Sequence, residues 1–168
     1  ESKIMKYRHL GNSGLEVSVI GLGTNNFGGR MEFKEAREVI FAAIDEGMNL
    51  IDTANIYSHG NSEEIIGRSL VDRRDEVLIA TKFGMLWEEG PHGKGGSRKH
   101  IVESLEGSLR RLQTDYVDLY QIHKQDPDTP IDETLRALDD MVKDGKVRYI
   151  GLSNFDPWRI ADAQWTAK

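Results

Sequence analysis

The stretch GMNLIDTANIY, residues 47–57, contains the end of a helix, a short strand and a group of polar side chains. The residues before it recur at the spacing of one helix face: Val39, Ile40, Ala43 and Ile44. Gly47 stands where a C′ glycine ends such a helix. Leu50-Ile51 then predicts a short buried strand, and Asp52 follows it directly. Helix, strand and polar residue therefore follow one another in order.

The same order continues on both sides of this stretch. Short apolar runs predict strands at 19–23, 50–51, 77–80, 117–120 and 147–152. Helix-spaced apolar residues between them predict helices around 39–44, 65–70, 101–112 and 135–142, and a fifth from near Pro157. Strict alternation implies parallel strands joined by right-handed helical crossovers. Ahead of the first strand, the turn-rich segment 11–14 predicts an opening hairpin between 7–10 and 15–17.

Individual signals sharpen two of these helices and one connection. Ser97 is the expected N-cap of the third helix. In the fourth, we expect Thr129 to cap, Pro130 to occupy the first helical position and Gly145 to end the helix. Its inward-facing residues are expected to be Leu135, Leu138 and Val142. The glycine-rich segment 84–96 is too long for a tight turn and predicts a mobile loop over a site.

Composition excludes several classes of function. The chain has 168 residues, 38% of them hydrophobic and 30% charged, which is ordinary for a folded protein. A net charge of −6, with basic clusters no longer than Arg110-Arg111 and 98–100 on a predicted helix, makes nucleic acid an unexpected partner. The absence of cysteine excludes disulfides and thiol chemistry. With no apolar run near membrane length and no signal-peptide pattern, we expect a soluble, cytoplasmic protein without membrane partners.

A polar residue stands at the carboxyl end of every predicted strand. The five strands end at Thr24, Asp52, Lys82, His123 and Ser153-Asn154. Each has an ordinary explanation when taken alone: a turn aspartate, a solvated lysine, a hydrogen-bonded core histidine. In a barrel of parallel strands, however, these ends meet on one face, where groups from different strands form a catalytic site. We therefore consider them together.

Asp52, Tyr57, Lys82 and His123 suit the protonation of a carbonyl oxygen while hydride reaches its carbon. A free tyrosine, with a pKa near 10, is a poor proton donor at neutral pH. A lysine ammonium about 4 Å away favours the phenolate by roughly 4 kcal/mol at an effective dielectric near 20. A buried lysine needs a counter-charge, which Asp52 supplies, and His123 can orient the carbonyl. Every role is filled without a metal.

These residues also lie in motifs that resemble the aldo-keto reductase family. Segment 47–57 resembles its G-x-x-x-x-D-T-A-x-x-Y motif, 80–82 its lysine strand, 109–123 its fourth-strand motif and 145–155 its fifth. The opening residues 7–15 and the segment 97–101 are similar to the branch of bacterial reductases and potassium-channel β-subunits. The resemblance implies a (β/α)8 TIM barrel with an N-terminal hairpin. Such a barrel needs about 250 residues. We therefore expect 1–168 to be one barrel domain, C-terminally incomplete, with about five of the βα units.

The resemblance also assigns site residues and a cofactor. The family tetrad falls on Asp52, Tyr57, Lys82 and His123, with Tyr57 as proton donor, and the cofactor is expected to be NADP(H). Cofactor contacts are expected at Thr24, Asn25, Arg30, Asp52, Ser153 and Asn154. The sequence GLGTNN, 21–26, fails the G-x-G-x-x-G pattern at Asn26, but this family binds its dinucleotide across the barrel face instead. Phe27, Phe83 and Trp87 are candidates for lining the pocket, although core packing explains the two phenylalanines equally well.

Three functions remain open at this level. The leading one is reduction of a small aldehyde or ketone, in a protein that can also form a homo-oligomer. The second is a redox-sensing regulatory subunit of the channel β type. Some of those subunits carry asparagine at the position of His123, so this histidine favours a reductase. The third is a Schiff-base aldolase that uses Lys82, which leaves Tyr57 without a role.

Overall fold

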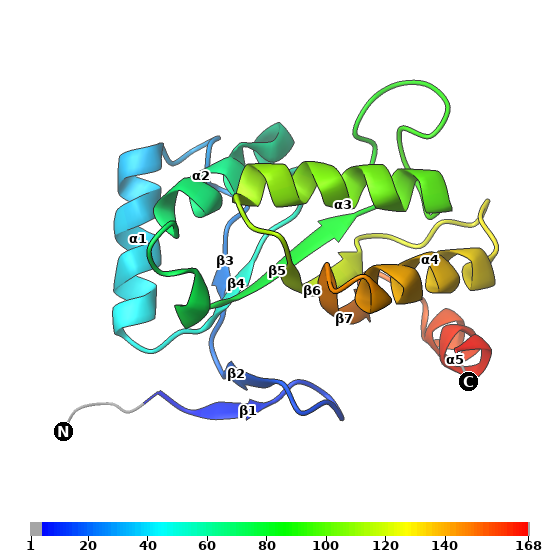
Figure 1. The fold of residues 1–168 in the computed structure, drawn as a ribbon, viewed down its shortest axis with the longest axis horizontal. Coiled ribbons are helices and arrows are strands. Elements are labelled where there is room, and N and C mark those ends of the chain that lie inside the picture. The colour runs from blue at the N-terminus through cyan, green and yellow to red at the C-terminus, as the bar shows by residue number, and fades with distance from the viewer. Residues whose placement is uncertain (1–4, 168) are drawn as a thin grey trace.

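The computed structural model describes residues 5–167 and has an α/β architecture (Figure 1). A two-stranded antiparallel hairpin comes first, formed by β1 (Tyr7–His9) and β2 (Glu16–Ser18). A parallel sheet follows in the order β3-β4-β5-β6-β7. Its strands are β3 (Leu22–Gly23), β4 (Leu50–Asp52), β5 (Leu78–Phe83), β6 (Val117–Ile122) and β7 (Val147–Leu152). Spatial order equals chain order, as in a barrel built one βα unit at a time, and the structure is a partial barrel.

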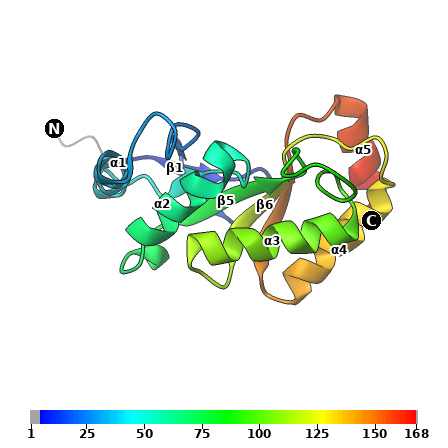
Figure 2. The same cartoon turned by 90° about the horizontal axis from the view of Figure 1, so that it is seen from above.

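Helices connect successive strands, and α1 to α4 lie along one face of the sheet (Figures 1 and 2). They are α1 (Phe33–Asp45), α2 (Asn61–Ser69), α3 (Arg98–Leu112) and α4 (Ile131–Lys143), with α5 (Pro157–Thr166) last. Two short segments, η1 (Tyr57–Gly60) and η2 (Arg74–Glu76), stand before and after α2; η2 is a 3₁₀ helix, whereas Ser58 and His59 in η1 have non-helical φ and ψ. The predicted hairpin, helices and four of the five strands are therefore confirmed. The strand predicted at 19–23 is limited to Leu22–Gly23, because Val19 and Ile20 lie outside the sheet and are 50% and 54% exposed. Within the described residues, no helix combines the length and apolar character needed to cross a membrane.

The core lies between the sheet and these helices. The strands contribute residues such as Ile51, Ile79, Phe83, Tyr120 and Ile122, and the helices contribute Ile40, Ile66, Ile101, Leu105 and Leu138. At the amino end of the sheet, Asn49 links the hairpin to β4. Its side chain accepts from Ser18 N at 2.7 Å and donates to Glu16 O at 3.1 Å. The carboxyl ends of the strands remain accessible for a site.

Helix α1 ends as the sequence predicts. Gly47 has φ +88°, and the amide of Met48 donates to Ala43 O while that of Gly47 donates to Ile44 O. This pair of bonds is a Schellman motif, whose left-handed residue is normally glycine. Val39, which shares the predicted apolar spacing, is 37% exposed at the margin of the buried face.

Helix α4 differs from the prediction at its start and on its buried face. Pro130 is the N-cap rather than the first helical residue, and Thr129 does not cap, because its hydroxyl donates to Asp126 at 2.7 Å. The buried face consists of Thr134, Ala137, Leu138 and Met141, whereas Leu135 and Val142 are half-buried. Thr134 can face inward because its hydroxyl donates to Gly96 O at 2.7 Å. A satisfied polar residue therefore rotates the helix away from the face predicted from apolar spacing alone.

The 84–96 loop leaves the carboxyl end of β5 and is anchored at several points (Figure 1). The amide of Trp87 donates to Gly93 O at 2.9 Å, and that of Gly95 donates to Gly84 O at 3.1 Å. The ring of His100, on α3, bonds His92 O at 2.7 Å. Mobility of this loop stays a prediction.

Candidate active site

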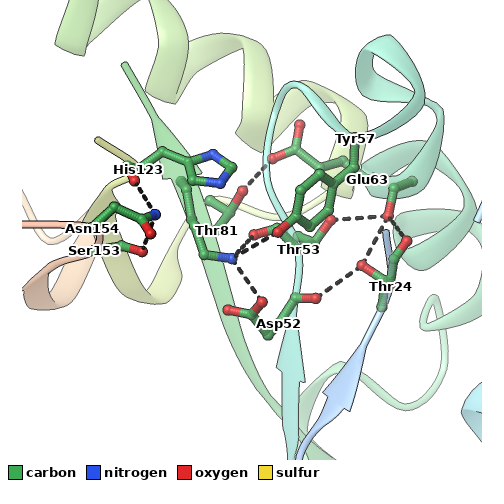
Figure 3. Close-up of polar contacts among 11 residues, drawn as sticks. Thr24, Asp52, Thr53, Tyr57, Glu63, Thr81, His123, Ser153 and Asn154 are labelled. Carbon is green, nitrogen blue, oxygen red and sulfur yellow. Dashed lines mark hydrogen bonds and ion pairs between the residues drawn. The ribbon is translucent and has the colours of Figure 1, made fainter. Parts of the chain in front are cut away.

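A buried lysine, Lys82, bonds to polar groups at the strand ends; its partners Asp52, Thr53 and Tyr57 are labelled in Figure 3. Lys82 Nζ donates to Asp52 Oδ2 at 2.7 Å and to Thr53 O at 2.9 Å, and it lies 3.5 Å from Tyr57 Oη. The parallel register of β4 and β5 brings these residues together, because Asp52 ends β4 opposite Ala80, two residues before Lys82. Lys82 is 6% exposed, so its charge depends on these partners.

Tyr57 is held by an unusual turn. Ser58, His59 and Gly60 have φ values of 47°, 50° and 90°, so three successive residues adopt left-handed conformations. Such backbone is unfavourable for residues other than glycine and persists only where neighbouring structure supports it. The turn leads directly into α2, which begins at Asn61. It places Tyr57 beside Lys82 instead of carrying it away along a helix.

His123 follows β6 and faces Tyr57. Their rings are 5.7 Å apart in an edge-to-face arrangement with an interplanar angle of 81°. Burial lowers the pKa of the His123 imidazole below its usual value, and the Lys82 ammonium lowers it further, against a smaller opposing effect of Asp52. The ring is therefore neutral at pH 7 and carries one N–H donor. A neutral donor beside a phenol is suited to orienting a carbonyl oxygen.

Ser153 and Asn154 follow β7 next to His123. Asn154 has φ +54°, and its Nδ2 donates to His123 O at 2.8 Å and to Ser153 Oγ at 3.0 Å. With Ser153 Oγ accepting this bond, its own proton can be donated, while Asn154 Oδ1 is an acceptor. A donor beside an acceptor matches a carboxamide, which offers the complementary pair. These two residues therefore fit a nicotinamide carboxamide, at positions where the sequence predicts cofactor contacts.

Thr24, expected as a cofactor contact, is completely buried instead. Its hydroxyl donates to Asp52 O at 2.9 Å and accepts from Ser62 Oγ at 2.9 Å, and Ser62 also bonds Thr53 at 3.0 Å. The side chain thus supports the Asp52 backbone, and contact of Thr24 with a cofactor stays a prediction. Asn25 and Arg30 are exposed in the loop after β3, where their cofactor contact stays a prediction.

The three candidate pocket residues separate into two groups. Phe27 and Phe83 are 3% and 0% exposed and belong to the core, so the packing explanation holds for both. Trp87 is half-buried and stacks on His59, with ring centroids 4.2 Å apart and an interplanar angle of 7°. Trp87 therefore contacts the turn that carries Tyr57.

Sequence reasoning missed a buried ion pair behind this site. Glu63 on α2 is completely buried, and its carboxylate accepts from Arg111 Nε at 2.7 Å and from Thr81 Oγ1 at 2.5 Å. Arg111 belongs to the Arg110-Arg111 pair, which had the pattern of a solvated helix surface. Glu63 stands beside Glu64 in the first turn of a helix, where carboxylates are common. Neither residue gives a local signal of burial.

The fold and site together define a class: partial (β/α) barrels in which a carboxylate, a phenol, an ammonium and an imidazole meet at the carboxyl ends of the strands. The chain belongs to the aldo-keto reductase family, because residues 19–168 match the model of the aldo/keto reductase family. Within residues 5–167, no group of histidine and carboxylate side chains is arranged to hold a metal ion.

Individual relatives agree with this assignment. The chain is 45% identical over 157 residues to aldo-keto reductase YhdN of Bacillus subtilis (strain 168), covering 90% of this chain and 47% of that protein. It is 42% identical to a probable voltage-gated potassium channel subunit beta of Oryza sativa subsp. japonica, covering 95% and 49% of the two chains. The solved holo form of aldo-keto reductase AKR11C1 from Bacillus halodurans superposes with a TM-score of 0.88 at 38% identity, covering 98% and 55%. The chain thus spans about half the length of the curated relatives it matches.

Proposed function

We propose that the complete protein is an NADP(H)-dependent oxidoreductase that reduces aldehydes or ketones to alcohols, with Tyr57 as the proton donor. The observation that carries this proposal is the group formed by Lys82 with Asp52 and Tyr57. Asp52 provides a counter-charge for Lys82 Nζ at 2.7 Å, and the same nitrogen lies 3.5 Å from the phenol oxygen. A charged ammonium there stabilises the phenolate left after proton donation.

The other residues complete the reaction geometry. Neutral His123 donates a hydrogen bond to the carbonyl oxygen and steadies the charge that develops on it. Ser153 and Asn154 hold the nicotinamide carboxamide, and a bound nicotinamide supplies the hydride. Tyr57 then delivers its proton to the oxygen, and Lys82 stabilises the phenolate that remains. Membership of the family and the likeness to a holo aldo-keto reductase support this assignment.

A steady-state comparison tests the proposal. The complete protein is assayed with 4-nitrobenzaldehyde and either NADPH or NADH, following the loss of nicotinamide absorbance. We expect turnover with NADPH and a lower kcat/KM with NADH. Absence of aldehyde reduction with both cofactors, in a correctly folded protein, would rule out the reductase function.

A regulatory role is the second candidate, favoured by the 42% and 40% identity to plant potassium channel β-subunits. It predicts tight NADPH binding, measured by fluorescence, without reduction of any carbonyl. His123 favours the reductase instead, because its neutral ring supplies a donor beside Tyr57.

The aldolase alternative requires a free amine on Lys82. Lys82 Nζ instead already contacts three oxygens, Asp52 Oδ2, Thr53 O and Tyr57 Oη, so attack on a carbonyl would require these contacts to break. We therefore expect that borohydride traps no substrate adduct on Lys82, which mass spectrometry of the treated protein would check.

A further inference from the structure

The Glu63 carboxylate bonds both to Thr81, which precedes Lys82, and to Arg111, which packs against the turn after Tyr57. Glu63 has no exposed surface, and each of its two oxygens has its own partner. A buried carboxylate is stable only with hydrogen bonds and a counter-charge, which Thr81 and Arg111 supply. The two partners belong to β5 and α3, so one side chain joins three elements of the fold.

The first oxygen, Oε1, fixes the strand that carries Lys82. Thr81 Oγ1 donates to it at 2.5 Å, and Thr81 immediately precedes Lys82 on β5 (Figure 3). Successive strand residues face opposite sides of a sheet. Holding Thr81 on the helix side therefore directs Lys82 toward Asp52 and Tyr57 on the other side.

The second oxygen, Oε2, fixes Arg111, which packs against the strained turn after Tyr57. A Cβ added to Gly60 would lie 2.7 Å from Arg111 Cδ and 3.3 Å from Trp87 Cη2, so both side chains press on this residue. The Arg111 guanidinium also lies 4.8 Å from the Trp87 ring centroid, and Trp87 stacks on His59. The left-handed residues 58–60 thus have a support whose position depends on Glu63.

We propose that Glu63 is a positioning residue that sets the separation of Tyr57 Oη and Lys82 Nζ through Thr81 on one side and Arg111 on the other. The inference rests on the proposed reductase function for its kinetic readouts and on geometry alone for its structural readout. Shifts of about 1 Å at reacting groups can cost on the order of 100-fold in rate.

Glu63→Gln in the complete protein tests this inference, because the amide cannot serve both partners as a carboxylate does. We expect kcat for 4-nitrobenzaldehyde to fall by about 10- to 100-fold, with the Kd for NADPH unchanged within about twofold. The solvent deuterium isotope effect on kcat should rise, since proton transfer from a displaced Tyr57 becomes rate-limiting. In a crystal structure, the separation of Tyr57 Oη and Lys82 Nζ should exceed the present 3.5 Å.

Arg74→Met is the matched control. Arg74 pairs with Asp118 at 2.8 Å, with side-chain exposures of 15% and 10%, near the amino ends of β5 and β6. The Arg74→Met substitution should lower Tm but leave kcat, the isotope effect and the Tyr57–Lys82 separation unchanged. If Glu63→Gln does not fold, Thr81→Val, which removes only the first contact, decides on the same readouts.

The proposal is overturned if the folded Glu63 or Thr81 variant matches Arg74→Met in kcat, isotope effect and separation. A wild-type protein that reduces no carbonyl would instead count against the reductase function. The crystallographic separation would then decide the positioning role by itself.

Discussion

Lys82 is buried, and each of its three hydrogen-bond donors has a partner: Asp52 Oδ2, Thr53 O and Tyr57 Oη. Of these, Asp52 supplies the only charge, at 2.7 Å, and its carboxylate remains 40% exposed. Water therefore shares in solvating the pair, and the contribution of this ion pair to stability is modest. In the proposed reaction its contribution is larger, because only a charged Lys82 would stabilise a Tyr57 phenolate.

Asp52→Asn should therefore affect activity more than stability. We expect kcat/KM for carbonyl reduction to fall by about 10-fold or more, since the buried Lys82 side chain loses its 2.7 Å counter-charge. The free energy of unfolding should fall by no more than about 1–2 kcal/mol, measured by urea denaturation. Asp45→Asn, which breaks the exposed pair with Arg73, is the control and should change neither quantity appreciably. Unchanged kcat/KM in Asp52→Asn would contradict the role of the counter-charge.

Residues at strand ends were predictable from the sequence, and supporting residues were not. Asp52, Lys82 and His123 each follow an apolar run, so the parallel sheet itself brings them together. Glu63 is buried only because Thr81 and Arg111, distant in the chain, supply partners. Thr24 has the right position for a ligand contact, but Ser62 and Asp52 turn its hydroxyl inward. Such pairings depend on tertiary contacts that one sequence does not reveal.

At the level of elements, the end of α1 depends on the backbone of Gly47. Gly47→Ala would place a Cβ in a left-handed residue, and that Cβ would lie 2.9 Å from Met5 Cβ. We expect the free energy of unfolding to fall by about 1–2 kcal/mol in urea denaturation, because this conformation is unfavourable for alanine. Gly14→Ala is the control, because a Cβ there meets nothing within 4 Å. Equal free energies of unfolding for Gly47→Ala and Gly14→Ala would show that the left-handed glycine of the Schellman motif is not needed for stability.

His100 makes the anchoring of the 84–96 loop on α3 sensitive to pH. Burial lowers the pKa of His100, whose ring bonds His92 O and Ser104 Oγ. The unfolded chain, with a histidine pKa near 6.5, therefore takes up this proton first as pH falls. Stability is thus complete above about pH 6.5 and decreases as pH falls toward the lowered value.

In His100→Gln, the free energy of unfolding measured in urea should fall less steeply between about pH 7 and pH 5 than in the wild type, since one titrating group is removed. The lowered pKa of His123 contributes a loss of the same sign in both proteins. His9→Gln, at an exposed position of β1, should keep the wild-type slope. A His100→Gln slope as steep as that of wild type would contradict this assignment.

Element types were more predictable than element faces. Alternating apolar runs predicted the order of strands and helices, because each run must be buried. The buried face of α4 was predicted correctly at Leu138 but not at Leu135 and Val142, since Thr134 enters the core by bonding Gly96 O. Left-handed Ser58 and His59 were also unforeseen, because neither residue type demands that conformation.

At the scale of the whole molecule, strands β3 and β7 end the parallel sheet without a further neighbour among the described residues. Large apolar side chains near β7 and α5 are exposed: Ile150, Trp158, Ile160 and Trp165. Open sheet edges and apolar patches promote association. The 168-residue polypeptide, expressed by itself, should therefore self-associate in light scattering and bind NADPH only weakly by fluorescence. A monomer that binds NADPH tightly would contradict this expectation.

We propose that Tyr57 donates the proton in a site organised by Lys82. The most direct measurement is single-turnover reduction of 4-nitrobenzaldehyde by Tyr57→Phe in the complete protein, with the Kd for NADPH measured alongside. Loss of the hydroxyl should lower the rate by about 100-fold or more, because general acid catalysis contributes roughly that much, while the Kd changes little. A Tyr57→Phe protein that reduces the aldehyde at the wild-type rate would contradict the account.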